Sequence, residues 1–310
     1  MLAVSHSPLG WWSLGDSVSI RQFRFGVALH TSGSRTEWRA KARRAEDLGY
    51  DVLLVPDHLG MTAPFPSLVA AAEATSRPRL GTLVLNTGFY KPALLARDVA
   101  STAQLVEGRL ELGLGAGWAR DEYEAAGLPF PSGGRRIDHL ARTMTELRRL
   151  LLDDQVGPPG AQRLTVPIMV AGQGDRLLTL AAEHADIVGL AGVVPGKRTG
   201  VDDPGEAALA ERIAFIRAAA GSRLPAIELN LMISAVALTT SGEEPDLSIP
   251  RQFSPDLSDS EILQLPGVLH GTASEIADTL NRYREQFGLT YFTLTEPSMV
   301  DFASVISQLR

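Results

Sequence analysis

Eight short apolar runs alternate with longer amphipathic segments, and this alternation constrains the fold more than any other feature of the 310-residue chain. It is typical of strand–helix repeats, whose strands form a parallel sheet. The predicted strands span residues 23–29, 51–55, 79–85, 109–114, 166–171, 186–190, 226–233 and 290–295. The length suits a single barrel of about 250 residues with insertions. We therefore expect an α/β fold, a closed (β/α)₈ TIM barrel rather than an open sheet.

Helix signals between these strands support the alternation. A segment over 36–48 carries apolar residues on one face and stops at Gly49, and Pro92 stands where another helix begins. Near the end of the chain, Thr272 and Glu275 have the spacing of a capping box, which predicts a helix start there.

The predicted domain organisation is an N-terminal extension over 1–22 followed by one barrel domain over 23–310. Two stretches, 191–205 and 239–260, are rich in Pro, Gly, Ser and Asp and exceed ordinary loop length. Both follow strands, so they would project from the C-terminal rim, where barrel active sites lie. Their composition fits lids over a site and passive disordered insertions equally well.

Composition excludes several classes of protein. With 45% hydrophobic and 21% charged residues, the chain has the make-up of an ordinary folded globule, and without cysteine it has no disulfide, thiolate metal site or cysteine nucleophile. The net charge of −7 disfavours nucleic acid as a partner. No basic, apolar leader and no window of about 18 apolar residues is present, so we expect no membrane association and a cytoplasmic location. Histidine spacing predicts no metal site.

Candidate chemistry begins where the first two predicted strands end. The second strand runs into Asp57-His58, a carboxylate beside an imidazole that titrates near neutral pH and so suits proton transfer. The alternative is that Asp57 caps a helix and His58 a loop. The first strand ends at His30, which either lines the same pocket or bonds to a loop carbonyl.

Polar and glycine-rich turns follow the next three strands. Amide and hydroxyl groups at the third suit hydrogen bonding to a planar ring, and glycines at the fourth and fifth admit close approach of a ligand to the main chain. A helix start after the fifth strand supplies free amides for a phosphate. Each pattern also fits an ordinary turn. The candidate cofactor-binding residues are Asn86 and Thr87, then Gly115, Ala116, Gly117 and Trp118, then Gly172, Gln173, Gly174 and Asp175.

Three segments together resemble a known family. The runs AEDLGYDVLLVPDH (45–58), the stretch 81–131 around LGLGAGWARDEYEAAG, and VPIMVAGQGD (166–175) are similar to the luciferase-like monooxygenase superfamily, in particular to its branch that uses the deazaflavin coenzyme F420. The likeness is detailed over about 23–190. It implies a (β/α)₈ barrel, in agreement with the strand count.

The resemblance also implies roles for individual residues. Asp57 matches a position that touches the deazaflavin, and His58 matches a proton donor. Asn86 matches a ring contact that follows a strand-three bulge, which in relatives contains a non-prolyl cis peptide. The turns that hold the ring and the phosphate tail match Ala116 and Gly117, then Gly174 and Asp175.

Two departures from the family matter for the predicted function. Trp118 replaces the catalytic glutamate of the sugar-phosphate dehydrogenases, which disfavours that activity, and Tyr90 replaces a common arginine, which leaves a cofactor contact there in doubt. The leading hypothesis is an F420-dependent oxidoreductase that moves a hydride to or from a small organic substrate, with His58 exchanging the proton. The alternatives are an FMN-dependent monooxygenase served by a separate reductase, and a non-catalytic flavin-binding barrel. Oligomeric state stays open, although relatives commonly form homodimers.

Overall fold

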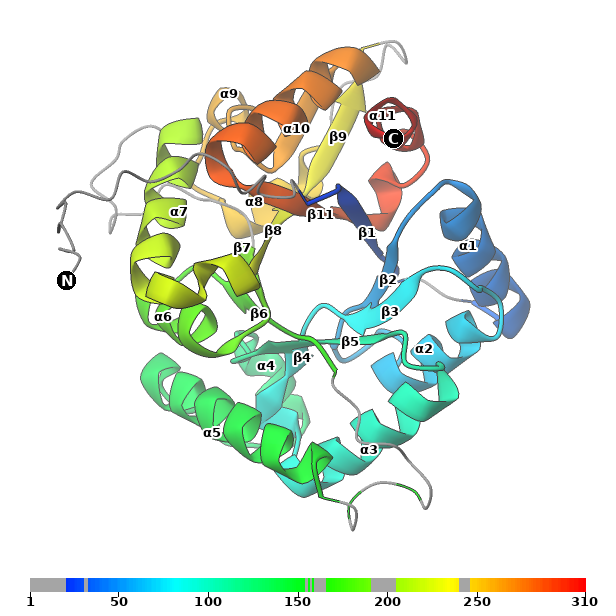
Figure 1. Cartoon of the computed structure of the whole chain (residues 1–310), viewed down its shortest axis with the longest axis vertical. Coiled ribbons are helices and arrows are strands. Elements are labelled where there is room, and N and C mark those ends of the chain that lie inside the picture. Colours follow the sequence, from blue (N-terminus) through cyan, green and yellow to red (C-terminus); the bar gives the residue numbers. More distant parts are fainter. Residues whose placement is uncertain are drawn as a thin grey trace, which may run out of the picture.

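Parallel strands at eight positions, which we call staves, close into a barrel with helices on its outside (Figure 1). One stave can consist of two short strands. The computed structural model describes residues 21–30, 33–153, 156, 158, 166–190, 205–239 and 246–310. The staves are β1 (Arg24–Ala28), β2 (Val52–Val55), β3 with β4 (Arg79–Thr82, Leu85–Asn86), β5 (Leu110–Gly115), β6 (Ile168–Gly172), β7 (Ile187–Leu190), β8 (Glu228–Ile233) and β11 (Leu289–Thr295). Pairing of β3 and β4 with β5 closes the ring. The predicted fold class and all eight predicted strands are confirmed.

The third stave is broken near its end. A cis peptide bond joins Leu83 to Val84, between β3 and β4, so the non-prolyl cis bond implied by the resemblance is confirmed. The Val84 side chain packs against β5, where a Cβ on Gly115 would lie 2.5 Å from Val84 Cγ2. Glycine is therefore required at this position, because any side chain would collide with the bulge.

Helices cover the barrel in chain order. They are α1 (Arg35–Asp47), α2 (Pro64–Ala72), α3 (Pro92–Leu105), α4 (Arg120–Ala125), α5 (Gly133–Leu151), α6 (Asp175–His184), α7 (Glu206–Ala220), α8 (Ser248–Phe253), α9 (Asp259–Ile262), α10 (Ala273–Phe287) and α11 (Ala303–Leu309), with short 3₁₀ turns η1 (Thr87–Phe89), η2 (Gly221–Ala226) and η3 (Glu296–Ser298). The capping box at Thr272 and Glu275 is present, and Pro92 begins α3, as predicted.

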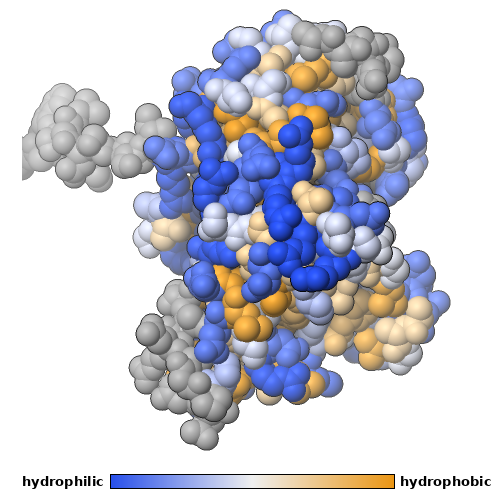
Figure 2. All heavy atoms as spheres, turned by 90° about the vertical axis from the view of Figure 1, so that its right-hand side faces the viewer, coloured by the Kyte–Doolittle hydropathy of each residue, from blue (hydrophilic) through white to orange (hydrophobic). Residues whose placement is uncertain are grey.

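Buried apolar residues fill two layers. The larger core lies between the strands and the helices, and α1 contributes to it with Trp38, Ala42 and Ala45. The outer side of α1 is charged, and Figure 2 shows hydrophilic side chains at the centre of this face of the molecule. A smaller cluster consists of Val52, Leu54, Met169, Ile187 and Tyr291. Its members come from β2, β6, β7 and β11 and fill the barrel interior.

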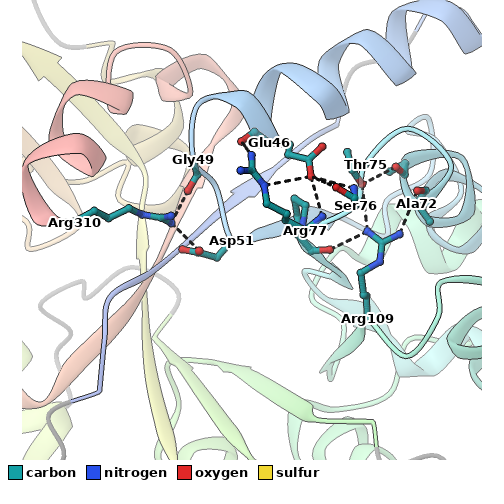
Figure 3. A network of polar contacts seen from close by, with 11 residues as sticks. Glu46, Gly49, Asp51, Ala72, Thr75, Ser76, Arg77, Arg109 and Arg310 are labelled. Carbon is teal, nitrogen blue, oxygen red and sulfur yellow. Dashed lines mark hydrogen bonds and ion pairs between the residues drawn. The ribbon is translucent and has the colours of Figure 1, made fainter.

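A network of arginines fastens the loops that precede the strands (Figure 3). Arg109 donates to the carbonyl oxygens of Ala72 and Pro78, at 3.2 and 3.1 Å, and Arg310 donates to Gly49 O and Asp51 Oδ1. The Arg109 bonds join the segments before β3 and β5, and the Arg310 bonds join the loop before β2 to the end of the chain. They lie at the end of the barrel away from the predicted site, so their role is structural.

Two strands of the described residues were not predicted. β9 (Ala235–Leu238) pairs in parallel with β10 (Val268–Gly271) outside the barrel. Of the predicted insertions, 191–204 and 240–245 lie outside the described residues, as does most of the predicted extension, 1–20. Residues 246–260 carry α8 and α9, so this part of the second insertion is folded. Among the helices described, none is long and apolar enough to cross a membrane.

Candidate functional site

The candidate residues stand at the carboxyl ends of five neighbouring staves, β1, β2, β3 with β4, β5 and β6. Register shows how close the ends lie, because Asn86 is opposite Gly115 and Leu114 is opposite Val170. Turns that follow these strands therefore meet along one arc of the C-terminal rim. This is the part of a (β/α)₈ barrel that carries active sites.

His58 is held by two side chains from the loop and helix that follow β5. Its Nδ1 lies 2.7 Å from Glu122 Oε1, and its ring meets Trp118 edge to face, with ring centroids 5.8 Å apart. The His58 side chain is 30% exposed, whereas Trp118 is 68% exposed. The imidazole is thus fixed at the rim and still open to a ligand.

Asp57 links the ends of the second and third staves. Its Oδ2 accepts a hydrogen bond from the Asn86 backbone N at 3.0 Å, and its carboxylate also bonds to the Tyr90 hydroxyl. Burial raises the pKa of Asp57, although these two hydrogen bonds oppose the rise. Burial, followed by the Asp57 charge, likewise raises the pKa of the Tyr90 phenol. The carboxylate is therefore less stable as an anion here than in water.

Asp57→Asn should become progressively more stable than the wild type as pH rises. A raised pKa means that the folded chain keeps the Asp57 proton at pH values where the unfolded chain, with a pKa of about 3.9, has lost it. Wild-type stability therefore falls as pH rises from that value through the folded-state pKa, and the asparagine variant lacks this contribution. Urea unfolding at pH 4 to 7 tests it, with Asp121→Asn, an exposed aspartate, as the control. A constant difference between Asp57→Asn and wild type across this range would contradict it.

Asn86 and Thr87 shape the rim. Asn86 Oδ1 accepts from the Tyr123 hydroxyl at 2.9 Å and from Gly88 N at 3.1 Å. The Thr87 hydroxyl is buried and donates to Gly115 O. These contacts lock the η1 turn onto the end of β5, and the ring contacts inferred for Asn86 and Thr87 stay predictions.

The glycine turn after β5 is built around the same asparagine. Gly117 has φ +73°, and a Cβ there would lie 2.3 Å from Asn86 Oδ1. Arg136 of α5 donates to Gly117 O at 2.9 Å and so holds the turn from outside. Only glycine allows this close approach, which brings Ala116 and Trp118 to the edge of the mouth.

The turn after β6 leads directly into α6. Gly174 is the N-cap residue, and apart from its chain neighbours no atom of the described residues lies within 4 Å of where its Cβ would be. Asp175 pairs with Arg212 of α7 at 2.6 Å. Among the described residues, the turn from Gly172 to Asp175 therefore has room for a ligand next to a helix start, where backbone amides lack partners within the helix.

His30 lies just after β1, which pairs with β2. Its backbone N donates to Glu296 Oε2 at 3.0 Å, and the other oxygen of Glu296 pairs with Lys41. A cavity of about 750 Å³ is lined by His30, Gly33, Glu37, Lys41, Gly60, Met61 and Thr62. His58 is not among its lining residues, so the structure sets the two histidines in different surroundings, and a catalytic role for His30 stays a prediction.

Two carboxylate residues at the rim, Glu122 and Glu296, were not predicted from the sequence. Glu122 contacts His58 from 64 residues away, and Glu296 contacts His30 from 266 residues away. A signal was present for Glu296, which directly follows the last predicted strand and so had to lie on the rim. Glu122 is one of several acidic residues after the glycine turn, and nothing in the pattern singles it out.

The upper wall of the barrel is apolar and accessible. Leu83, Val84, Ala116 and Ala171 stand near the carboxyl ends of neighbouring staves, and each is partly exposed. Leu83 and Ala171 also pack on the buried interior cluster, so they form the upper surface of that layer. Among the described residues, these side chains form a partly exposed apolar surface above the buried interior cluster, and this surface suits the face of a flat heterocycle.

Comparison with known proteins agrees with this geometry. The family model for luciferase-like monooxygenases matches residues 18–245. An F420-dependent glucose-6-phosphate dehydrogenase from Intrasporangium calvum is 33% identical over 166 residues, which are 46% of this chain and 50% of that protein. The chain thus spans about half the length of this curated relative.

Two solved structures share the fold. The coenzyme F420-dependent tetrahydromethanopterin reductase from Methanopyrus kandleri superposes with a TM-score of 0.72 at 16% identity, covering 94% of this chain and all of that one. A long-chain alkane monooxygenase gives a TM-score of 0.72 at 16% identity, covering 93% and 91%. At such identities the likeness establishes the barrel and leaves the choice of cofactor to other evidence.

Proposed function

Because this chain belongs to the luciferase-like monooxygenase family, we propose that it is an oxidoreductase that binds coenzyme F420 and moves a hydride to or from a small organic substrate. The proposal rests chiefly on one observation: Glu122 and Trp118 hold the partly exposed imidazole of His58 at the rim that also carries a partly exposed apolar surface. The similarity to an F420-dependent dehydrogenase supports this cofactor over FMN.

The residues present fit such a cofactor. Leu83 and Val84 offer an apolar surface for one face of a tricyclic ring, and the partly exposed Ala116 after β5 offers a surface for the ring edge. The open space at Gly174, before the start of α6, suits the phosphate of the tail. F420 supplies hydride transfer when it is bound.

The protein contributes orientation and proton transfer. His58 gives a proton to the substrate atom next to the carbon that gains the hydride, or takes the proton when the substrate is oxidised. Asp57 fixes the start of this loop through its bond to the Asn86 backbone. The indole of Trp118, at the edge of the mouth, shields the imidazole on one side from water.

Titration of the protein with F420 and with FMN, followed by absorbance and fluorescence, tests the proposed cofactor. We expect saturable one-to-one binding of F420 and weaker binding of FMN. Tight stoichiometric binding of FMN without binding of F420 would overturn the proposal in favour of a flavin monooxygenase. Binding of F420 with no hydride transfer in a broad screen of electron donors and acceptors would instead indicate a non-catalytic barrel.

Gly174→Glu should weaken F420 binding about tenfold or more, whereas Gly174→Lys should not. Both side chains enter a space at the start of α6 that none of the described residues fills, so we expect neither to disturb packing. Only glutamate repels the anionic tail and competes for the helix amides. Equal affinities of the two variants for F420, measured by fluorescence titration, would show that the tail lies elsewhere.

A further inference from the structure

The contact between His58 and Glu122 determines which imidazole nitrogen is protonated. Nδ1 lies 2.7 Å from Glu122 Oε1, and both side chains are mostly covered, at 30% and 15% exposure. A carboxylate oxygen only accepts hydrogen bonds, so Nδ1 carries the hydrogen of this bond. The neutral ring then has its lone pair on Nε2.

We infer that Glu122 is the positioning residue for His58, which it holds in the Nδ1–H tautomer so that Nε2 exchanges the proton with the substrate. The inference rests on the proposed function for the identity of the reaction. In this role Glu122 affects the reaction only by positioning His58 and does not contact the substrate. Such a carboxylate fixes both the orientation of an imidazole and the nitrogen that it presents.

The local structure explains why Glu122 points at the imidazole. The next residue, Tyr123, is buried, and its hydroxyl donates to Asn86 Oδ1 at 2.9 Å. This anchor sets the rotation of the short helix α4 against the third stave. The first turn of α4 then lies across from the end of β2, where His58 begins its loop.

A second contact restricts the imidazole from the same side of the rim. The Trp118 ring stands at 67° to the His58 ring, with centroids 5.8 Å apart. Trp118 and Glu122 are four residues apart, and together they limit both rotation and translation of the ring.

Nitrogen-15 NMR of histidine-labelled protein tests the inference without any substrate. In the neutral form of the wild type, the His58 signals should show a protonated Nδ1 and an unprotonated Nε2, with His58→Ala identifying the signals. Glu122→Ala should shift the ring to the Nε2–H tautomer, which an unbonded imidazole prefers. Glu122→Gln should keep the Nδ1–H form, because its amide oxygen still accepts.

The matched control is Asp121→Ala, which removes an exposed acidic residue from the same helical turn. It should leave the His58 tautomer unchanged, and thermal unfolding should show that every variant is folded. Once a substrate is known, Glu122→Ala should lower turnover about 10²-fold or more, with F420 affinity unchanged.

The outcomes separate this inference from the proposed function. If the wild type fails to bind F420, the proposed function is wrong, whatever the tautomer. If F420 binds but Glu122→Ala keeps the Nδ1–H form, or Asp121→Ala changes the tautomer as much as Glu122→Ala does, then Glu122 does not position His58.

Discussion

Arg24→Met is expected to lower the free energy of unfolding by about 3–5 kcal/mol. Arg24 begins β1 and pairs with Glu111 of β5, at 2.6 Å, and with Glu228 of β8. The guanidinium also lies over the Tyr291 ring of β11, 4.5 Å from its centroid. The two carboxylate side chains are 2% and 13% exposed, so removal of Arg24 leaves negative charge in the barrel without its main partner.

The directions of the pKa shifts in this cluster agree with the expected loss of stability. Burial acts to lower the pKa of Arg24, but the two carboxylates raise it above its ordinary value. Burial raises the pKa of Glu228 even with Arg24 present. Without Arg24 the folded chain should hold protons more strongly than the unfolded chain, so the loss of stability should grow as pH rises above about 4.3.

Thermal and urea unfolding measure this loss, which corresponds to a Tm lower by roughly 5–10 °C. The matched control is Arg77→Met, because Arg77 is 72% exposed and pairs with Glu46 at the surface. Surface pairs contribute about 0–1 kcal/mol, so this variant should stay close to wild type. Equal losses of stability for the two variants would show that the buried Arg24 pairs contribute no more than a surface pair. The explanation would then be that Arg79, 3.5 Å from Glu111, compensates its charge when Arg24 is absent.

His58→Ala should lower the rate of hydride transfer about 10²- to 10⁴-fold, the range for loss of a general acid or base. The imidazole is the titratable side chain that Glu122 and Trp118 fix beside the mouth. Affinity for F420 should change little, because the apolar wall and the glycine turns do not involve this side chain. The measurement is the change in F420 absorbance with a substrate identified by screening.

His184→Ala is the matched control, since His184 ends α6 with a side chain that is 60% exposed. It should keep wild-type turnover. Added imidazole should restore part of the activity of His58→Ala and leave the control unchanged. Full turnover by His58→Ala would show that His58 does not transfer the proton. The contact between Glu122 and His58 would then have no role in catalysis.

The fold was predictable because its signals are local. Each barrel strand is a short apolar run, and a capping box or a proline marks where a helix begins. The β9–β10 pair was not predicted for two reasons. Ala235–Leu238 directly follows β8 and has the pattern of its continuation, and Val268–Gly271 has only four residues. A strand this short can be identified only from its pairing with another strand, and here that strand lies about 30 residues away in the sequence.

The sequence by itself determined which residues form the staves and which polar residues follow them, since burial on both faces of a parallel sheet demands continuous apolar runs. It therefore placed Asp57, His58 and the two glycine turns on one rim. Only the tertiary structure decided what each one touches. Glu122 reaches His58, and Arg24 reaches Glu111 and Glu228, because the closed ring brings distant staves together and packing sets the rotation of each helix against them. Those contacts depend on the geometry of the whole barrel, which no local pattern records.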